Sequence, residues 1–279
     1  MTFPNTSIIR KSTIFLAAAM LSVSAMAADF NQIQRLANQG MAEAQARLGL
    51  MYDKGEGVRQ DSAKARQWYE KAAIQGNSSA QFILGWMYYK GEGVPQDYGK
   101  AVEWYTKAAN QGDAQAQYNL GVMYTKGNGV RQDYAKAAQW YEKAANQGVP
   151  DAQAILGVMY FQGNGVRQDY AKAAQWYEKA ANQGVPDAQN SIGLMYFQGN
   201  GVRQDYAKAA QWYEKAANQG VPDAQAILGA MYYEGLGVRQ DYAKAAQWYE
   251  KAANQGVPDA QNSIGLMYYK GLGVRQDYA

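Results

Sequence analysis

Apolar residues recur along the chain with the spacing of two short amphipathic helices, and this pair repeats every 36 residues. In one copy the first stripe is Ala152, Leu156, Met159 and Tyr160, which share one face of a helix with 3.6 residues per turn. We name this predicted helix helix A. The second stripe predicts helix B and consists of Ala173, Trp176, Tyr177, Ala180 and Ala181. A fixed period of this length is typical of a solenoid of stacked units.

Glycine, aspartate and proline mark the predicted ends of both helices. Gly163 can adopt the left-handed conformation that ends helix A, and Gly165 keeps the following loop tight. Asp169 offers a side-chain oxygen to the free N–H groups at the start of helix B. Helix B ends at Gly184, and Pro186 fits the first turn of the next helix A.

A single pair of helices cannot bury enough apolar surface to offset the conformational entropy of its residues, so each pair must pack on its neighbours. Small residues at fixed places leave room for this packing. Helix A carries a central glycine in every copy, at Gly49, Gly85, Gly121, Gly157, Gly193, Gly229 and Gly265. Helix B carries an alanine suited to the same close approach, at Ala72, Ala108, Ala144, Ala180, Ala216 and Ala252.

The shared pattern resembles the Sel1-like repeat, a relative of the tetratricopeptide repeats, and reads A-x-x-x-L/I-G-x-M-Y-x-x-G-x-G-V-x-Q-D-x-x-K-A-x-x-W-Y-x-K-A-A-x-x-G. It recurs six times in full and a seventh time in part, starting at Ala44, Ala80, Ala116, Ala152, Ala188, Ala224 and Ala260. The resemblance implies an all-α fold, a right-handed α-solenoid of about seven antiparallel helix pairs. It also implies an adaptor for protein–protein contacts.

Residues 1–27 have the features of a secretory signal peptide. Arg10 and Lys11 precede an apolar stretch that ends in Ala25-Met26-Ala27, a pattern that predicts cleavage before Ala28. The apolar stretch is too short to span a bilayer comfortably, so we expect no integral membrane segment after cleavage. The predicted location is the bacterial periplasm or the outside of the cell.

The remaining chain divides into a cap and an array. Residues 28–40 end in the same ANQG as helix B and are expected to form an N-terminal capping helix with Ile33, Leu36 and Ala37 on its inner face. Residues 41–279 form the array, with six complete repeats and a seventh cut short. The sequence stops where another helix B is expected to begin. Either the sequence is truncated, or the end of the array pairs with another molecule in end-to-end self-association.

Composition excludes several function classes. The sequence has no histidine and no cysteine, which removes histidine bases, thiol nucleophiles and the usual zinc ligands. The mature chain also lacks the S-x-x-K signature of serine β-lactamases. We therefore expect no enzymatic activity, no cofactor and no metal. Cleavage of Arg10 and Lys11 from the 27 basic residues leaves 25 against 24 acidic ones, and this net charge of +1 argues against nucleic-acid binding.

The loop between the helices carries two features that could suggest a ligand. Its G-x-G lacks the preceding strand and the lysine of a phosphate-binding loop, and the single aspartate per unit forms no catalytic pair, so both are interpreted as helix caps. A row of loop arginines could contact an acidic partner or lipid headgroups. The simpler alternative is a solvated edge, because an acid follows two residues after Arg131, Arg167, Arg203, Arg239 and Arg275, and after Arg59.

Sequence differences between units are concentrated on helix A, whereas helix B is nearly invariant. One of these variable positions, near the loop end of helix A, is aromatic in five units: Tyr89, Phe161, Phe197, Tyr233 and Tyr269. In related helical arrays helix A lines the concave surface, and aromatic residues are favoured binding anchors, so these rings could form a ladder for an extended peptide. The alternative is that they pack on the loop of the next unit.

The leading hypothesis is a non-catalytic interaction scaffold that binds a protein or peptide along the helix A face. One alternative is a cell-wall or β-lactam-binding hydrolase of the cysteine-rich Sel1-like type, which the absence of cysteine disfavours. Another is a surface-exposed factor that contacts host cells.

Overall fold

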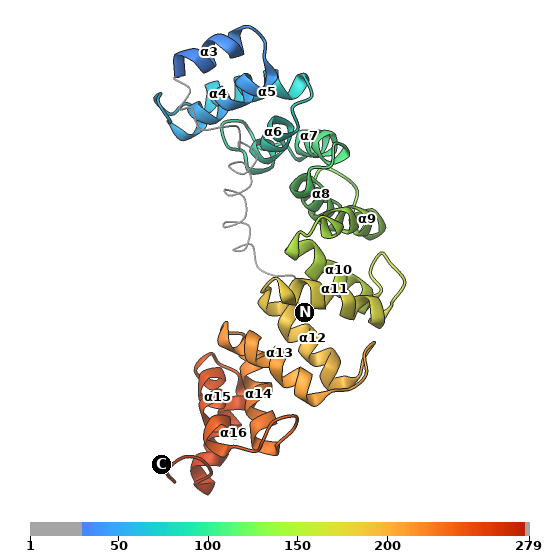
Figure 1. Cartoon of the computed structure of the whole chain (residues 1–279), viewed down its shortest axis with the longest axis vertical. Helices are drawn as coiled ribbons and strands as arrows, with labels where there is room; N and C mark the ends of the chain where they lie inside the picture. The colour runs from blue at the N-terminus through green and yellow to red at the C-terminus, as the bar shows by residue number, and fades with distance from the viewer. Residues whose placement is uncertain (1–29, 277–279) are drawn as a thin grey trace. The chain divides into compact units, whose positions relative to one another are not determined.

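A computed structural model of the chain describes residues 30–276 (Figure 1). The predicted signal peptide and its cleavage site lie outside the described residues. Within residues 30–276 there are fourteen helices and no strand, and the helices form seven repeats of paired helices. The all-α solenoid predicted from the repeats is therefore confirmed.

The helices follow the predicted order. A short helix, α3 (Phe30–Asn38), comes first. Helix A of the successive repeats is α4 (Ala42–Lys54), α6 (Ser78–Lys90), α8 (Ala114–Lys126), α10 (Pro150–Gln162), α12 (Pro186–Gln198), α14 (Pro222–Glu234) and α16 (Pro258–Lys270). Helix B is α5 (Ser62–Ile74), α7 (Tyr98–Asn110), α9 (Tyr134–Asn146), α11 (Tyr170–Asn182), α13 (Tyr206–Asn218) and α15 (Tyr242–Asn254).

The described chain forms two compact units. Unit 1 comprises the described residues up to 123, with 128–131, and unit 2 comprises 124–127 with the described residues from 132 onward. In unit 1, α3 contacts α4 and each helix from α4 to α7 contacts the next. In unit 2 the same holds from α9 to α16, as the neighbouring helix pairs in Figure 1 show. Within each unit these helices therefore touch their neighbours in sequence, as expected of stacked repeats.

The hydrophobic core lies between repeats as well as within them. In unit 2, Ala173 and Tyr177 of α11 form one buried cluster with Ile192 and Met195 of α12, in the next repeat. Trp212 of α13 completes this cluster. Because helix B packs on the following helix A and on the following tryptophan, removal of one repeat would expose the apolar faces of two others.

The central glycine of helix A is explained by a tyrosine ring. A Cβ atom built on Gly157 would lie 2.6 Å from Cε1 of Tyr177, in helix B of the same repeat. In unit 1 a Cβ on Gly85 would lie 2.8 Å from Cε1 of Tyr105. The predicted close approach of a facing helix is therefore confirmed for these two glycines, and that helix is helix B of the same repeat, whose ring a larger residue would displace.

Buried glutamines hold successive repeats in register. Gln153 of α10 donates from Nε2 to the carbonyl of Ala145 at 3.0 Å, and its Oε1 accepts a hydrogen bond from Gln183 at 2.7 Å. Gln183 also donates to the carbonyl of Gly148 at 3.0 Å. The side chain of Gln153 is buried, so each of these bonds satisfies a group that would otherwise be costly to bury. The same arrangement recurs at Gln189 and Gln225.

Candidate protein-binding surface

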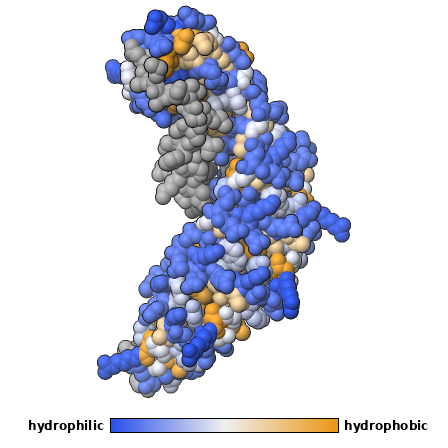
Figure 2. All heavy atoms as spheres, viewed as in Figure 1, coloured by the Kyte–Doolittle hydropathy of each residue, from blue (hydrophilic) through white to orange (hydrophobic). Residues whose placement is uncertain are grey.

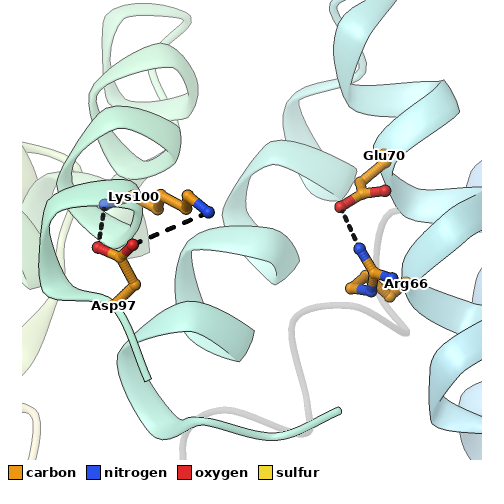
Figure 3. A network of polar contacts seen from close by, with 4 residues as sticks. All are labelled: Arg66, Glu70, Asp97 and Lys100. Carbon is orange, nitrogen blue, oxygen red and sulfur yellow. Dashed lines mark hydrogen bonds and ion pairs between the residues drawn. The ribbon is translucent and has the colours of Figure 1, made fainter. Parts of the chain in front are cut away.

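The caps of the loop between the helices agree with the sequence analysis. Gly163 ends α10 in the left-handed conformation, with φ of 77°. Asp169 caps the start of α11, and its Oδ1 accepts a hydrogen bond from the backbone N–H of Lys172 at 3.0 Å. Figure 3 shows the same cap at Asp97 and Lys100 in unit 1. The repeated aspartates are thus used in holding the start of helix B.

The five aromatic residues predicted as binding anchors all lie at the loop end of helix A. Tyr89, Phe161, Phe197 and Tyr233 are half-buried, whereas 61% of Tyr269 is exposed. Each of the four half-buried rings stands near the tyrosine that opens helix B of its own repeat. The ring centroids are 5.2 Å apart for Phe161 and Tyr170, and 5.1 Å apart for Phe197 and Tyr206. These distances and the steep angle between the rings suit a favourable edge-to-face pair.

The loop glutamine fastens this aromatic pair to the loop. Gln168 donates from Nε2 to the carbonyl of Phe161 at 2.8 Å and contacts the hydroxyl of Tyr170 at 3.1 Å. Gln204 repeats both contacts with Phe197 and Tyr206. The loop therefore folds back over the end of helix A, and its residues lie beside the aromatic rings.

The second loop glycine has a role that the sequence analysis missed. Besides the positive φ expected of a tight loop, Gly201 lies against the preceding repeat. A Cβ on Gly201 would overlap the carbonyl group of Tyr170 and lie 2.6 Å from the nitrogen of Ala171. Gly237 meets Tyr206 in the same way. Successive loops of unit 2 are therefore packed closely along one edge.

The positions of helix A that differ between repeats are those that are partly exposed. In α10 the buried residues Ala152 and Leu156 belong to the common pattern, whereas Ala154, Val158 and Phe161 are half-buried and variable. The equivalent residues of α12 are Asn190, Leu194 and Phe197, and those of α14 are Ala226, Ala230 and Tyr233. We name these partly exposed, variable positions of helix A the variable face.

The exposed side of helix B behaves differently. Gln175, Glu178, Lys179 and Asn182 of α11 are exposed, yet the same four residues occupy the equivalent exposed places in α9 and α13. Exposure alone therefore does not explain why the variable face of helix A differs from repeat to repeat.

Comparison with known families agrees with this geometry. The Sel1 repeat model matches seven consecutive segments: residues 42–77, 78–113, 114–149, 150–185, 186–221, 222–257 and 258–279. The chain belongs to the Sel1 repeat family.

Solved structures of bacterial Sel1 repeat proteins are similar to the chain. A protective antigen present in uropathogenic Escherichia coli strains is 44% identical, with a TM-score of 0.81 over 89% of this chain and 53% of that one. The chain thus spans about half the length of that antigen. A Sel1 repeat protein from Oxalobacter formigenes is 41% identical, with a TM-score of 0.70 over 89% of this chain and 72% of that one. A search of curated proteins found no significant match.

Membership of the Sel1 family gives a coarse function. Sel1 repeat proteins generally mediate protein–protein interaction, and the Sel1 fold is typically a non-catalytic scaffold. Among residues 30–276 no helix is both long and apolar enough to cross a bilayer. In the same residues no three acidic side chains gather in a way that could hold a metal ion.

A buried tyrosine hydroxyl lies at each boundary between Sel1 repeats, and its environment differs. Tyr177 hydrogen-bonds to Ser191 of the next repeat, and burial raises its pKa to about 12. Tyr213 is fully buried, burial raises its pKa further, and its hydroxyl has no hydrogen-bond partner among the described residues. In the next repeat Ile227, which takes the place of Ser191, packs on the cluster that contains Tyr213. The alternation between serine and isoleucine therefore changes the chemistry of alternate boundaries.

Proposed function

We propose that this Sel1 repeat chain is a non-catalytic scaffold that binds an extended protein segment along the variable face of helix A. Tyr89, Phe161, Phe197, Tyr233 and Tyr269 would serve as the anchoring rings. The observation that carries this proposal is the contrast between the two exposed surfaces. From α9 to α13 helix B keeps identical exposed residues from copy to copy, whereas the half-exposed residues of helix A differ between the same repeats.

Duplicated copies that only drift would accumulate differences on every exposed surface to a similar degree. On helix A, three of the positions that vary share one stripe, at Ala154, Val158 and Phe161 in α10. Such a stripe offers each part of a bound segment a different contact, which is how repeat arrays recognise extended partners. The half-buried rings add rigid apolar area at small entropic cost.

We further propose that the chain works outside the bacterial cytoplasm, after removal of residues 1–27. The basic, apolar and A-x-A segments at the start of the sequence support this location. The similarity to a protein described as a protective antigen also supports it, because antigens that protect are those that antibodies can reach.

The test is crosslinking of the tagged protein in intact cells, followed by mass spectrometry of the captured proteins. The test variant is Phe161→Leu/Phe197→Leu/Tyr233→Leu, which removes three rings but keeps apolar side chains against Tyr170, Tyr206 and Tyr242. The control changes exposed residues of helix B in the same repeats, Gln175→Ala/Gln211→Ala/Gln247→Ala.

We expect the leucine variant to lose the proteins captured by the wild type, while its melting temperature stays within a few degrees and the control captures them normally. We also expect mass spectrometry to show that the tagged protein itself begins at Ala28 in the crosslinked complex. Equal capture by the leucine variant and the wild type would refute the proposed surface. A large fall in melting temperature would show instead that the rings serve the packing of the repeats.

A further inference from the structure

The loop arginines of unit 2 lie next to the proposed anchoring rings. Arg167 directly precedes Gln168, whose side chain bonds to the carbonyl of Phe161. Arg203 stands in the same relation to Gln204 and Phe197. The loop that holds Arg203 also packs on the backbone of Tyr170, which forms the aromatic pair with Phe161. Arginines and rings therefore share one edge of the repeats.

These guanidinium groups are not used within the fold. Arg167, Arg203, Arg239 and Arg275 are exposed, and within the described residues none of them has an ion pair or a hydrogen bond. The acid two residues further on does not neutralise them by contact, because Asp169 and Asp205 accept backbone hydrogen bonds at the start of helix B. Asp169 and Asp205 thus cap helix B, and neither forms an ion pair with the arginine that precedes it.

The loop ends of two neighbouring repeats carry the same excess positive charge. In the repeat from Pro150, Arg167 and Lys172 stand against Asp169, and the other polar residues there, Gln162 and Asn164, are neutral. Lys172 lies over the ring of Tyr160, with 5.2 Å from Nζ to the ring centroid. The repeat from Pro186 has the same residue types at these positions.

In these two repeats the acidic residue of helix A lies at its other end. Asp151 and Asp187 are in the first turns of α10 and α12, and a helix of 13 residues is about 20 Å long at 1.5 Å per residue. This length exceeds the Debye length of about 8 Å at physiological ionic strength, so these carboxylates do little to cancel the field at the loop end.

We propose that the segment bound at the anchoring rings is acidic, with carboxylates that pair with Arg167 and Arg203 while its apolar side chains contact Phe161 and Phe197. This inference rests on the proposed function, because it assigns a chemistry to the partner of the same surface. Arginine suits the role, since its planar guanidinium binds a carboxylate through two parallel hydrogen bonds. Figure 2 shows hydrophobic residues as small separate spots among hydrophilic ones on the face that it draws, which fits mixed apolar and polar recognition.

The experiment measures the binding of three fluorescein-labelled peptides to the full chain by fluorescence anisotropy. The peptides share the same phenylalanine and leucine residues and differ in the residues between them, which are glutamate, glutamine or lysine. The test variant is Arg167→Glu/Arg203→Glu. Its control is Lys179→Glu/Lys215→Glu, which makes the same change in net charge on helix B, about 14 Å along α11 from its first residue.

We expect the glutamate peptide to bind most tightly and the lysine peptide least. The arginine variant should bind the glutamate peptide with about tenfold lower affinity than the wild type does at low salt. A higher salt concentration should reduce this difference in affinity. The lysine control should bind as the wild type does. The assignment of an acidic protein segment would be overturned if the three peptides bound with equal affinity, or if arginine reversal had no effect. It would also be overturned if double-stranded DNA displaced the labelled glutamate peptide as well as the unlabelled glutamate peptide does.

The variant Phe161→Leu/Phe197→Leu separates this inference from the proposed function. If it loses all three peptides while arginine reversal changes nothing, the ring surface stands and the acidic assignment is wrong. If arginine reversal weakens the glutamate peptide and loss of the rings does not, the arginine edge binds acidic segments and the proposed anchoring rings are wrong.

Discussion

Replacing Tyr213 with phenylalanine removes a hydroxyl that is fully buried and has no hydrogen-bond partner among the described residues. Tyr177 provides a matched comparison, because α11 and α13 have the same sequence. Both rings also pack on the central glycine of helix A in their own repeat. The main difference lies in the next repeat, where Tyr177 meets Ser191 and Tyr213 packs near Ile227.

The two substitutions should therefore change stability in opposite directions. A buried polar group without a partner costs about 1–3 kcal/mol, so Tyr213→Phe is expected to leave stability unchanged or to raise it by about 1 kcal/mol. Tyr177→Phe removes the hydrogen bond to Ser191, whose hydroxyl still donates to the carbonyl of Asp187 at 2.8 Å, and this loss should cost about 1 kcal/mol. The expected difference between the variants is about 2 kcal/mol.

A local measurement suits this prediction, because a repeat array need not unfold in one step. Hydrogen exchange followed by mass spectrometry reports on peptides from α11 and α13 separately, and urea unfolding gives the global effect. A double-mutant cycle with Ser191→Ala isolates the coupling between Tyr177 and Ser191. If Tyr213→Phe destabilises the chain as much as Tyr177→Phe does, the hydroxyl of Tyr213 has a partner in solution, such as Asn190, and the reasoning fails.

Two further predictions concern pH and backbone conformation. Burial raises the pKa of Tyr69, Tyr105, Tyr177 and Tyr213 above the value of 10.0 expected in the unfolded chain, so the folded state holds these protons more tightly. Stability should therefore be complete below pH 10 and fall as pH rises above it, with absorbance at 295 nm showing late tyrosine ionisation that coincides with loss of helical circular dichroism. Gly201→Ala should cost about 2–3 kcal/mol, because it combines a positive φ with overlap on the backbone of Tyr170. Gly184→Ala, also at positive φ but with no atom within 4 Å of its Cβ, should cost about 1 kcal/mol, and equal melting temperatures for the two variants would contradict this account.

The helices and their caps could be predicted because they depend on local chemistry. The apolar spacing of Ala152, Leu156 and Met159, the left-handed conformation open to Gly163 and the capping oxygen of Asp169 act within a few residues of one another. The repetition of this sequence pattern along the chain then indicated stacked repeats, because a single pair of helices could not be stable alone.

The contacts between repeats could not be predicted in the same way. Gln153 meets Gln183 across 30 residues, and Gly201 meets Tyr170 across a distance in sequence that no local rule covers. The alternation between Ser191 and Ile227 was visible in the sequence. Nothing in the sequence showed that this position would face the hydroxyl of a tyrosine in the preceding repeat. The sequence also showed Asp169 two residues after Arg167, but it did not show that the two side chains form no ion pair.

By itself the sequence determined the repeat, the helix type, the cap residues and the absence of histidine and cysteine chemistry. These follow from periodicity and composition, which are properties of short stretches of chain. The tertiary structure decided that, among the described residues, the arginines beside Phe161 and Phe197 form no ion pair and the hydroxyl of Tyr213 has no hydrogen-bond partner. Those outcomes depend on atoms brought together from different repeats, and a one-dimensional pattern does not contain that proximity.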